Sequence, residues 1–566
     1  MHTRYRLIIL VVLILVTIIL HGPIIFYGIP HALGNVDEND FIGTALNYGA
    51  TKSLKPLITW YPAFYSYVLT LAIGIYFTVL VIFSDISSVT GFAVHYLTSP
   101  GYFHMVGRFM SLIFSVVSII LIYSCGKKYY NYRAGLFAAF LFTFSPILFT
   151  RLVWALPAST FILLVLISLF FIFKYIEHDQ IKYIIWAGFS CGLAISTKYN
   201  VGIFFLVGLT ALYLVRAENG KWLAWQTLKK LIFSSHLYLY CIFILIGFLL
   251  ASPYWLIELR ENIHGLLWEI GRLDSESTVS KVWLSNLPYI WILSEFIIKE
   301  GLFGLIYTIS LGYIFFASFH KKRKAILFFP FVLVGLILIG KYQKHSLHYL
   351  LPIYPALIIV AGKMLSEWWQ YGRTRLKISM SLLLIAGIFI PPQNVLRYAS
   401  SYIHKDVRLL ASEWIKHYIP PGTPLIIGKT SNSAPLHDCI RFDKPYYSSI
   451  SEQVLSVKLP TTIKDAYQQK ISNECYPLYN YIVKTSIGRT ESFSEMMSDI
   501  VILPFKEIKS YEPEYLIFST MDSLYYSKQN KQQGIYGVSG YKDHLMHLKT
   551  FTSTGQDSLI IYKLIN

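Results

Sequence analysis

The sequence predicts a polytopic α-helical membrane protein with a small polar α/β domain at its C-terminal end. Of its 566 residues, 55% are hydrophobic and 16% are aromatic, while only 14% are charged. This composition is too apolar for a soluble globular protein of the same length. Uncharged runs recur along the chain, each close to the ~20 residues that a helix needs to cross ~30 Å of hydrocarbon. The final stretch, residues 395–566, has no such runs.

Eleven membrane spans are expected, and the first of them is predicted to be retained. The apolar run behind Arg4 and Arg6 is longer than the core of a signal peptide and lacks a small-residue cleavage site at its end. The expected spans cover residues 7–29, 106–125, 134–150, 158–174, 183–197, 200–215, 232–252, 301–318, 325–340, 349–364 and 377–392.

Lysine and arginine predict the orientation of these spans, because short cytoplasmic loops carry an excess of both. With eleven spans, every basic cluster falls on the cytoplasmic side. The clusters are Arg4 and Arg6; Lys127, Lys128 and Arg133; Lys174 and Lys182; Arg216, Lys221, Lys229 and Lys230; Lys321, Lys322, Arg323 and Lys324; and Arg373, Arg375 and Lys377.

One further apolar run, residues 64–83, would invert this arrangement if it crossed the membrane once. We therefore expect it to lie in the outer interface or to re-enter without crossing, although a pair of re-entrant crossings satisfies the same rule. It begins with WYPAFY, residues 60–65, which suits an interface.

This orientation predicts two domains. Residues 1–394 form a transmembrane module, whose first external loop covers residues 31–105, and residues 395–566 form an external domain. In the second domain, DVRLLASEWIKHY (406–418) has helical spacing and ends at the breaker IPPG. Short β-like runs follow at Pro424–Ile427, Tyr515–Phe518 and Ser558–Leu564.

The formal net charge of +18 does not indicate a nucleic-acid partner. Most of it is explained by topology and by anionic lipid headgroups, and no basic stretch has the aromatic interleaving of a nucleic-acid module. Three of the five cysteines, Cys125, Cys191 and Cys241, lie in or beside spans and are expected to pack there. The other two, Cys439 and Cys475, could form a disulfide on the outer side or remain free thiols.

Three carboxylates follow the first span directly, in the stretch GNVDENDF (34–41). They are Asp37, Glu38 and Asp40. Charge near lipid is costly, so acids at the end of a span are candidates for function. A carboxylate here could act as a general base on an acceptor hydroxyl, or the three could share a divalent cation. Apart from such a cation, no cofactor is predicted.

Basic residues are expected at the outer ends of several later spans. They are Arg108, Arg151, Lys198, Lys341, Lys344, His345 and His348. Taken singly, each could be a snorkelling or headgroup contact. As a group beside an acidic loop, they suit the phosphate head of a lipid. Glu258, after SPYWLI, and Tyr61, in WYPAFY, are expected to support the acceptor side, together with Asp40 and Arg151.

Motifs for soluble nucleotides are missing from the sequence. It contains no Walker loop, no GxGxxG turn, no HExxH and no paired CxxC. An enzyme on the outer face has no soluble nucleotide sugar or ATP to use. Its activated donor is therefore expected to arrive on a lipid.

An ordered set of short motifs resembles the GT-C membrane glycosyltransferases, in the protein-mannosyltransferase-like branch (the glycosyltransferase 39 and aminoarabinose-transferase type). The motifs are the acid pair at 37–38, WYP at 60–62, GRFMSLIFSVVSIILIYSCGKKYYNYRAG at 107–135, SPILFTRL at 145–152, GLAISTKYN at 192–200, LLASPYWLIE at 249–258, HYLLPIYPAL at 348–357 and DVRLLASEWIKHYIPPGTPLIIG at 406–428. The resemblance covers nearly the whole chain.

The resemblance implies an inverting enzyme that moves one sugar from a polyprenyl-phosphate carrier to a lipid, glycan or protein acceptor. It implies that Asp37 is the base, that Glu38 assists it, and that Arg108, Lys198, His348 and Lys344 hold the lipid phosphate. The expected location is the bacterial inner membrane, with the site on the outer face. One departure concerns WALPAST (154–160), where Leu156 stands at a place that is acidic in many relatives. It bears on the acceptor class and on metal dependence.

Two other classes of function remain open at this point. A transporter or flippase of lipid-linked sugars would show inverted repeats with paired broken spans, and the sequence has no such symmetry. A non-catalytic protein that binds lipid-linked sugar would not need the acid pair at 37–38, which is intact.

Overall fold

The computed structural model describes most of the helical part of the chain and short pieces of the remainder. The described residues are 3–35, 37–217, 225–275, 290–320, 323–342, 346–389, 395–403, 406–421 and 423, followed by isolated stretches of 425–564. The chain divides into two compact units. The first unit contains residues 1–25, 51–71 and 107–400, and the second contains residues 26–50, 72–106 and 401–566.

Helices dominate the described residues up to residue 418. They are α1 (Thr3–Ile25), α2 (Glu38–Thr51), α3 (Phe64–Phe83), α4 (Val89–Thr98), α5 (Gly101–Tyr129), α6 (Tyr132–Phe144), α7 (Pro146–Leu152), α8 (Pro157–His178), α9 (Ile181–Ile195), η1 (Tyr199–Phe204), α10 (Phe205–Arg216), α11 (Trp225–Ile232), α12 (Ser235–Ala251), α13 (Tyr254–Ile257), α14 (Leu259–Ser275), α15 (Ile290–Glu300), α16 (Leu302–Phe319), α17 (Arg323–Ile326), α18 (Phe329–Gly340), η3 (Leu347–Ile353), α19 (Tyr354–Tyr371), α20 (Thr374–Phe389), α21 (Val395–Ser401) and α22 (Val407–Tyr418).

Seven of the helices in the described residues are long and apolar enough to cross a membrane, and the number rises to nine if each of two bent pairs is one span. All eleven runs predicted as spans contain a helix. Three of them correspond to shorter apolar helices, over 181–195, 324–340 and 377–389. The polytopic helical architecture is therefore confirmed, while the number of spans stays a prediction.

One predicted span is broken, and a bend precedes a second. Residues 134–150 form α6 and α7, which meet at a 62° bend, whereas α12 fills most of the predicted span 232–252 and meets α11 at a 52° bend. The first break lies at Ser145-Pro146, because the proline ring cannot continue the helix and Ser145 caps α7 with its hydroxyl. The buried carboxylate of Glu300 accepts hydrogen bonds from the Ser145 hydroxyl and from the Ile147 N–H.

The problematic run 64–83 is one uninterrupted helix. α3 has 20 residues and enough apolar length to cross a membrane. Its residues contain no turn at which the chain could reverse. That α3 stays in the outer interface remains a prediction.

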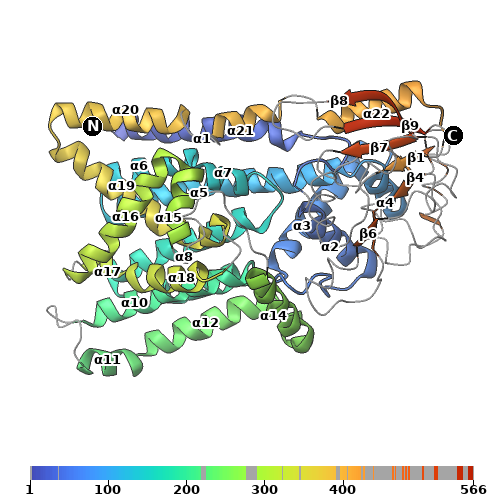
Figure 1. Ribbon diagram of the computed structural model, residues 1–566. Coiled ribbons are helices and arrows are strands. Elements are labelled where there is room, and N and C mark those ends of the chain that lie inside the picture. Colours follow the sequence, from blue (N-terminus) through green and yellow to red (C-terminus); the bar gives the residue numbers. More distant parts are fainter. Residues whose placement is uncertain are drawn as a thin grey trace. The chain divides into compact units, whose positions relative to one another are not determined.

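Small residues let helices of the first unit approach closely, as is typical of helix contacts in membranes. α9 packs against α12 through Gly192, where an added Cβ would lie 2.1 Å from the Ile244 carbonyl oxygen. Gly247 makes the reciprocal approach to Phe189. α6 packs along α19, whose residues are mostly buried (Figure 1).

The second unit joins the start of the acidic segment to the C-terminal stretch. The Tyr27 hydroxyl donates a hydrogen bond to Asp406, which is only 2% exposed and is also paired with Arg408 over 2.6 Å. Burial alone would raise the pKa of Asp406, but the hydrogen bonds and charge of Arg408 hold it below its usual value. α4 contributes a second contact, in which Val94 packs against residues 463 and 466.

Strands of the second unit form a mixed five-stranded sheet, drawn as red and orange arrows in Figure 1, in the order β4-β1-β7-β9-β8. Its strands are β1 (Leu425–Ile427), β4 (Leu478–Asn480), β7 (Tyr515–Ser519), β8 (Leu545–Phe551) and β9 (Leu559–Leu564). β1 runs parallel to β4 and β7, whereas β9 is antiparallel to both β7 and β8. Two small sheets pair β2 (His437–Asp438) with β3 (Cys475–Tyr476) and β5 (Ile482–Lys484) with β6 (Ile500–Ile502).

The predicted C-terminal elements coincide with observed ones: the helix at 406–418 with α22, and the three β-like runs with β1, β7 and β9. The boundary at 394–395 and the placement of the domain outside the membrane stay predictions. Cys475 lies in β3, and Cys439 falls outside the described residues. The disulfide between them is therefore untested. Cys125 and Cys191 are buried and unbridged, as expected for packing residues, while Cys241 is exposed.

The close contact of α9 and α12 predicts a strong response to one added methyl group. Gly192→Ala would place its Cβ against the α12 backbone, so the free energy of unfolding should fall by about 1–3 kcal/mol. Thermal unfolding of the purified protein in detergent measures the change. The matched control is Gly312→Ala in α16, where no atom lies within 4 Å of the added Cβ. Equal melting temperatures for the two variants would contradict the packing described for α9 and α12.

Candidate functional site

The acidic stretch surrounds the first turn of α2. Asp37 precedes the helix and is exposed, and its backbone N–H donates to the Asn35 side chain over 3.0 Å. Glu38 begins the helix, and Asp40 lies in its first turn. Carboxylates at this end are stabilised by the free N–H groups and the positive end of the helix dipole. The turn that starts α2 therefore presents acids in three different environments.

Glu38 is fully buried and faces a histidine. Its carboxylate lies 3.3 Å from Nδ1 of His104 on α5, and the two residues are 0% and 1% exposed. A buried carboxylate is stable only with hydrogen-bond or ionic partners. This contact fixes the N-terminus of α2 and therefore the direction in which the neighbouring Asp37 points. His104 was not predicted from the sequence.

Asp40 is tuned by its surroundings. The side chain reaches the surface, yet the protein around it desolvates the carboxyl group, and the Asp37 carboxylate adds repulsion. Together these effects raise the pKa of Asp40 to about 6. Near neutral pH, Asp40 therefore exchanges a proton more readily than an ordinary aspartate.

The possible metal site receives no support from a clustering of ligands. Among the residues that the structure describes, no three His, Cys, Asp or Glu side chains are grouped so that they could hold a metal ion. Asp37, Glu38 and Asp40 are all described, and Glu38 is directed toward His104.

In the first unit, Lys198 lies between two tyrosine rings. Its Nζ is 5.7 Å from the ring centroid of Tyr61 and 5.6 Å from that of Tyr349. Asn200 in the same STKYN stretch donates to the Tyr349 carbonyl over 2.9 Å. The structure thus brings three predicted motifs together: WYP, STKYN and HYLLPIYP. Aromatic faces attract an ammonium group electrostatically, and a lysine ammonium carries three hydrogen-bond donors.

Two serines dock the segment that carries Tyr61. The N–H of Ala63 donates to the Ser252 hydroxyl and the N–H of Phe64 to the Ser196 carbonyl, both over 3.1 Å. The two hydroxyls lie 2.5 Å apart, and both residues are buried. Two N–H groups at the start of α3 are thereby satisfied, and the position of Tyr61 relative to Lys198 is set by the ends of α9 and α12.

Arg108 is fully buried. It donates from Nη1 to the Ile24 carbonyl over 3.1 Å, and its guanidinium lies 4.8 Å from the Trp154 ring centroid. Trp154 belongs to WALPAST, the stretch that departs from the family pattern. A cation enclosed in this way organises the protein around it, and its role toward a lipid phosphate stays a prediction.

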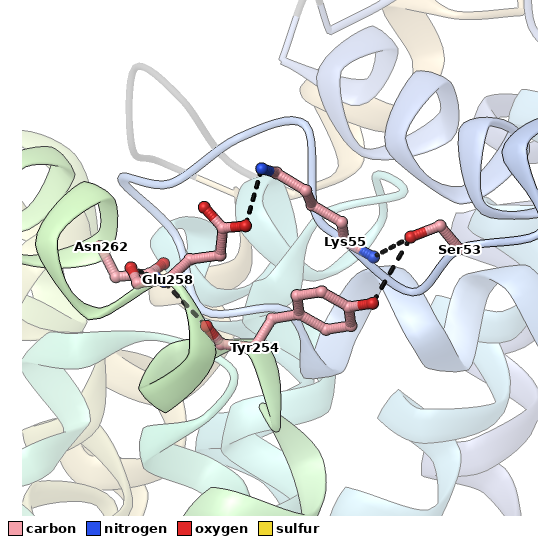
Figure 2. A network of polar contacts seen from close by, with 5 residues as sticks. All are labelled: Ser53, Lys55, Tyr254, Glu258 and Asn262. Atoms are coloured by element: carbon pink, nitrogen blue, oxygen red, sulfur yellow. Dashed lines mark hydrogen bonds and ion pairs between the residues drawn. The ribbon is translucent and has the colours of Figure 1, made fainter.

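Glu258 is engaged in a salt bridge that was not foreseen. Lys55 Nζ lies 2.7 Å from its carboxylate, and the side chains are 56% and 23% exposed. Figure 2 shows how this pair continues through Ser53 and Tyr254, whose hydroxyls lie 3.5 Å apart. Asn262 closes the network from α14 by donating to the carbonyls of Tyr254 and Glu258.

The remaining predicted residues are only partly described. Arg151 is half-buried in the last turn of α7. His348 is half-buried beside Tyr349, and its Nδ1 lies 2.6 Å from the Ser346 hydroxyl. Lys344 falls outside the described residues. The roles of these three residues stay predictions.

The missed residues carried weak signals. His104 stands four residues before Arg108 in GYFHMVGRF, and this spacing places both on one face of a helix. Tyr349 is one position after the predicted His348. Lys55 had no signal of its own, because its partner Glu258 lies 203 residues further along the chain.

Part of the chain matches a family defined by sequence. Residues 101–257 match the family described as "Dolichyl-phosphate-mannose-protein mannosyltransferase". The matched region includes His104, Arg108, Arg151 and Lys198 but not the acidic stretch. No curated protein matches the sequence.

Two solved structures resemble the whole chain. One is the oligosaccharyltransferase of Archaeoglobus fulgidus tethered to an acceptor peptide, with 13% identity, a TM-score of 0.52 and coverage of 99% of this chain and 74% of the other. The second is ArnT from Cupriavidus metallidurans bound to undecaprenyl phosphate, with 12% identity, a TM-score of 0.52 and coverage of 99% and 98%. Both are GT-C glycosyltransferases. At these identities the likeness concerns the fold, and it confirms the predicted GT-C architecture.

The contact between Glu38 and His104 predicts a measurable coupling energy. Glu38→Gln and His104→Gln should each lower the free energy of unfolding, because each alters one partner of a fully buried pair. The double variant should lose less than the sum of the single losses, by about 0.5–3 kcal/mol. Denaturant unfolding of the four proteins gives this value, and strictly additive losses would show that the two side chains do not interact.

Asp40 predicts a specific dependence of stability on pH. Its pKa is about 6 in the folded protein against an ordinary 3.8, so the folded state binds more protons between these values. Stability is therefore favoured below the ordinary pKa and is lost as the pH rises through about 6. Asp40→Asn lacks this loss, so its melting temperature relative to wild type should increase from about pH 4 to about pH 7.

Asp37→Asn provides the control for that measurement. It removes the nearby negative charge, so the loss of stability caused by Asp40 should be smaller and should be complete at a lower pH than in wild type. Parallel pH profiles for wild type and Asp40→Asn would contradict the raised pKa of Asp40.

Proposed function

We propose that this chain, which has the GT-C fold, is a membrane glycosyltransferase that transfers a single sugar from a polyprenyl-phosphate carrier to an acceptor at the outer membrane face. The acceptor is a lipid, a glycan or a protein. The membrane is a bacterial inner membrane in this proposal, with Lys- and Arg-rich loops in the cytoplasm. The solved structures with an acceptor peptide and with undecaprenyl phosphate support a lipid-linked donor and a separate acceptor.

The observation that carries the proposal is the contrast between two adjacent acids. Glu38 is buried against His104, whereas Asp37 is exposed at the N-terminus of α2. In the proposed mechanism, Glu38 positions the turn and Asp37 receives a proton. A general base has to reach the proton that it abstracts, and an exposed carboxylate on a fixed turn meets this need.

The reaction that we propose exchanges one bond for another. The acceptor oxygen or nitrogen attacks the anomeric carbon of the sugar as the bond from that carbon to the phosphate oxygen breaks. The acceptor proton goes to Asp37, the bonding electrons leave with the lipid phosphate, and the anomeric carbon is inverted. Asp40 is protonated below a pH of about 6 and then adds no negative charge beside Asp37.

Lys198 is the residue that we assign to the leaving phosphate. A point charge with three donors suits a phosphate oxygen, and the rings of Tyr61 and Tyr349 keep the ammonium in one place. Enzymes typically gain much of their rate enhancement by stabilising the charge that develops on a leaving group. His348, Lys344 and Arg108 are further candidates for the same lipid head, and Arg151 is a candidate for supporting the acceptor side.

The test compares variants in a transfer assay with lipid-linked sugar. Asp37→Asn should lower kcat by about 10²–10⁴-fold with little change in KM, because it removes the base. Lys198→Ala should lower kcat as well and, unlike Asp37→Asn, should raise the KM for the lipid donor. The matched control is Asp85→Asn, another exposed aspartate of the predicted first external loop, which should behave as wild type. Full turnover by Asp37→Asn would remove that residue from the mechanism.

The donor and acceptor are identified by mass spectrometry of lipids and glycans from cells with and without the gene. A single-sugar modification should disappear without the gene, return with wild type and fail to return with Asp37→Asn. Unchanged glycans in cells that make the protein would favour transport or non-catalytic binding of lipid-linked sugars.

A further inference from the structure

α14 has three chemically different sides. Its protein-facing side contains the buried residues Asn262 and Gly265. A second side is an apolar stripe of Leu259, Ile263, Leu267 and Ile270, which are 41%, 41%, 61% and 38% exposed. At 3.6 residues per turn these four side chains fall within an arc of roughly 80°. A third side carries the exposed polar residues Arg260 and His264.

The apolar stripe continues a surface that begins on a membrane span. α12, the second helix of a bent pair apolar enough to cross, exposes Ile242, Leu245 and Leu250 at 49%, 56% and 69%. After the break at Ser252-Pro253, α13 exposes Leu256 at 56% and Ile257 at 68%, and α14 follows. Large exposed apolar side chains thus recur from the span through α13 to Ile270 on α14.

We propose that α13 and α14 lie in the membrane interface, with the apolar stripe in lipid and with Arg260 and His264 at the water side. A helix divided in this way binds a lipid surface by burying its apolar face at the boundary of headgroups and chains. Lipid is the occupant that the geometry favours, because the stripe extends the lipid-facing surface of α12. The pairing of Trp60 with Trp268, at 5.4 Å between centroids, adds aromatic rings of the kind enriched at this depth.

The protein-facing side of α14 supports the segment that leads to Tyr61. An added Cβ at Gly265 would lie 2.6 Å from the backbone and side chain of Thr59, so the helix and this segment are in direct contact. Lys55 and Glu258 join the same two segments by an ion pair, shown in Figure 2. Water screens an exposed pair of this kind, so the attachment also depends on the contact at Gly265 and on the tryptophan pair.

The position of α14 affects the residues around Lys198, and this link rests on the proposed function. Tyr61 follows Thr59 and Trp60 and forms one wall beside Lys198. A helix that is held at the lipid surface therefore keeps Tyr61, one of the two aromatic rings beside Lys198, in place. Displacement of α14 from lipid should weaken donor binding without touching Lys198 itself.

The test measures the surroundings of α14 in the full-length protein. The five native cysteines are replaced, and single cysteines are introduced as Ile263→Cys and Leu267→Cys on the stripe and Arg260→Cys and His264→Cys on the polar side. Each is labelled with a nitroxide in vesicles of phosphatidylethanolamine and phosphatidylglycerol. Leu250→Cys on α12 provides the lipid-facing reference. Power saturation with oxygen and with a water-soluble nickel chelate reports lipid and water exposure.

The stripe labels should match the Leu250→Cys reference, with an oxygen-to-nickel accessibility ratio several-fold above that at Arg260→Cys and His264→Cys. Equal nickel accessibility on both sides of α14 would overturn the proposal. So would spin–spin broadening between labelled copies at Leu267→Cys, because it would show that a second copy of the chain covers the stripe. This result needs no turnover, so it stands or falls independently of the proposed reaction.

A second variant tests the link to the site. Leu267→Asp places a charge in the stripe and should raise the KM for the lipid donor several-fold in vesicles, while Arg260→Ala on the polar side should not. A nitroxide at Ile263→Cys in the Leu267→Asp background shows whether α14 has moved into water. An unchanged KM in a variant whose label has moved into water would contradict the support of Tyr61 by α14. If wild type itself transfers no sugar, the proposed function fails, and the accessibility result is unaffected.

Discussion

Helix breaks inside an apolar protein require polar partners for the backbone groups that they free. Serine residues supply such partners at three places in the first unit. Ser252 and Ser196 receive the N–H groups at the start of α3, and Ser145 caps α7 at the bend after α6. Each serine directly follows the last residue of a helix: Ser145 follows α6, Ser196 follows α9 and Ser252 follows α12. The residues of interest follow these breaks closely: Lys198 is two positions after Ser196, and Arg151 is six after Ser145. Irregular backbone is tolerated in these places because a serine hydroxyl or carbonyl accepts from its N–H groups, and the cationic residues depend on that irregular backbone for their position.

The acidic stretch shows how adjacent residues of one chemical type acquire different properties. Glu38 loses all contact with solvent and gains His104, whereas Asp37 remains exposed one residue earlier. Asp40, at the surface but desolvated by its neighbours, is left with a raised pKa. A helix turn produces this separation, because residues 37, 38 and 40 leave the start of α2 in different directions. The same three residues in an extended loop would have had similar surroundings.

Much of the helical architecture was predictable, because apolar runs of helical length have few alternatives in a membrane. The bend at Ser145 was missed because hydropathy alone does not distinguish a broken span from a straight one, although Ser-Pro was visible in the sequence. Pairs of residues far apart in the sequence were the main features that could not be predicted. Glu258 was predicted as a site residue without its partner Lys55, and Glu38 without His104. Neither pairing could be predicted from a local sequence pattern, because the partners are far apart in the sequence and only the packing of the helices brings them together. Lys198 was found because it belonged to a motif, yet its two tyrosine walls come from separate motifs that only the fold brings together.

The hydrogen bond from Tyr27 to Asp406 also sets an order of events during synthesis. The two residues are 379 positions apart, and Tyr27 stands at the start of the segment that leads to Asp37. At ribosomal rates of ~5–20 residues per second, roughly 20–75 s pass between the appearance of the two partners. During that interval the spans between them are already synthesised, while Tyr27, before the acidic segment, still lacks its hydrogen bond to Asp406. A chain that stopped after residue 403 would have every predicted span but not Asp406. Completion of the C-terminal stretch is thus the step at which a nascent, membrane-inserted chain acquires the full set of contacts around its first polar segment.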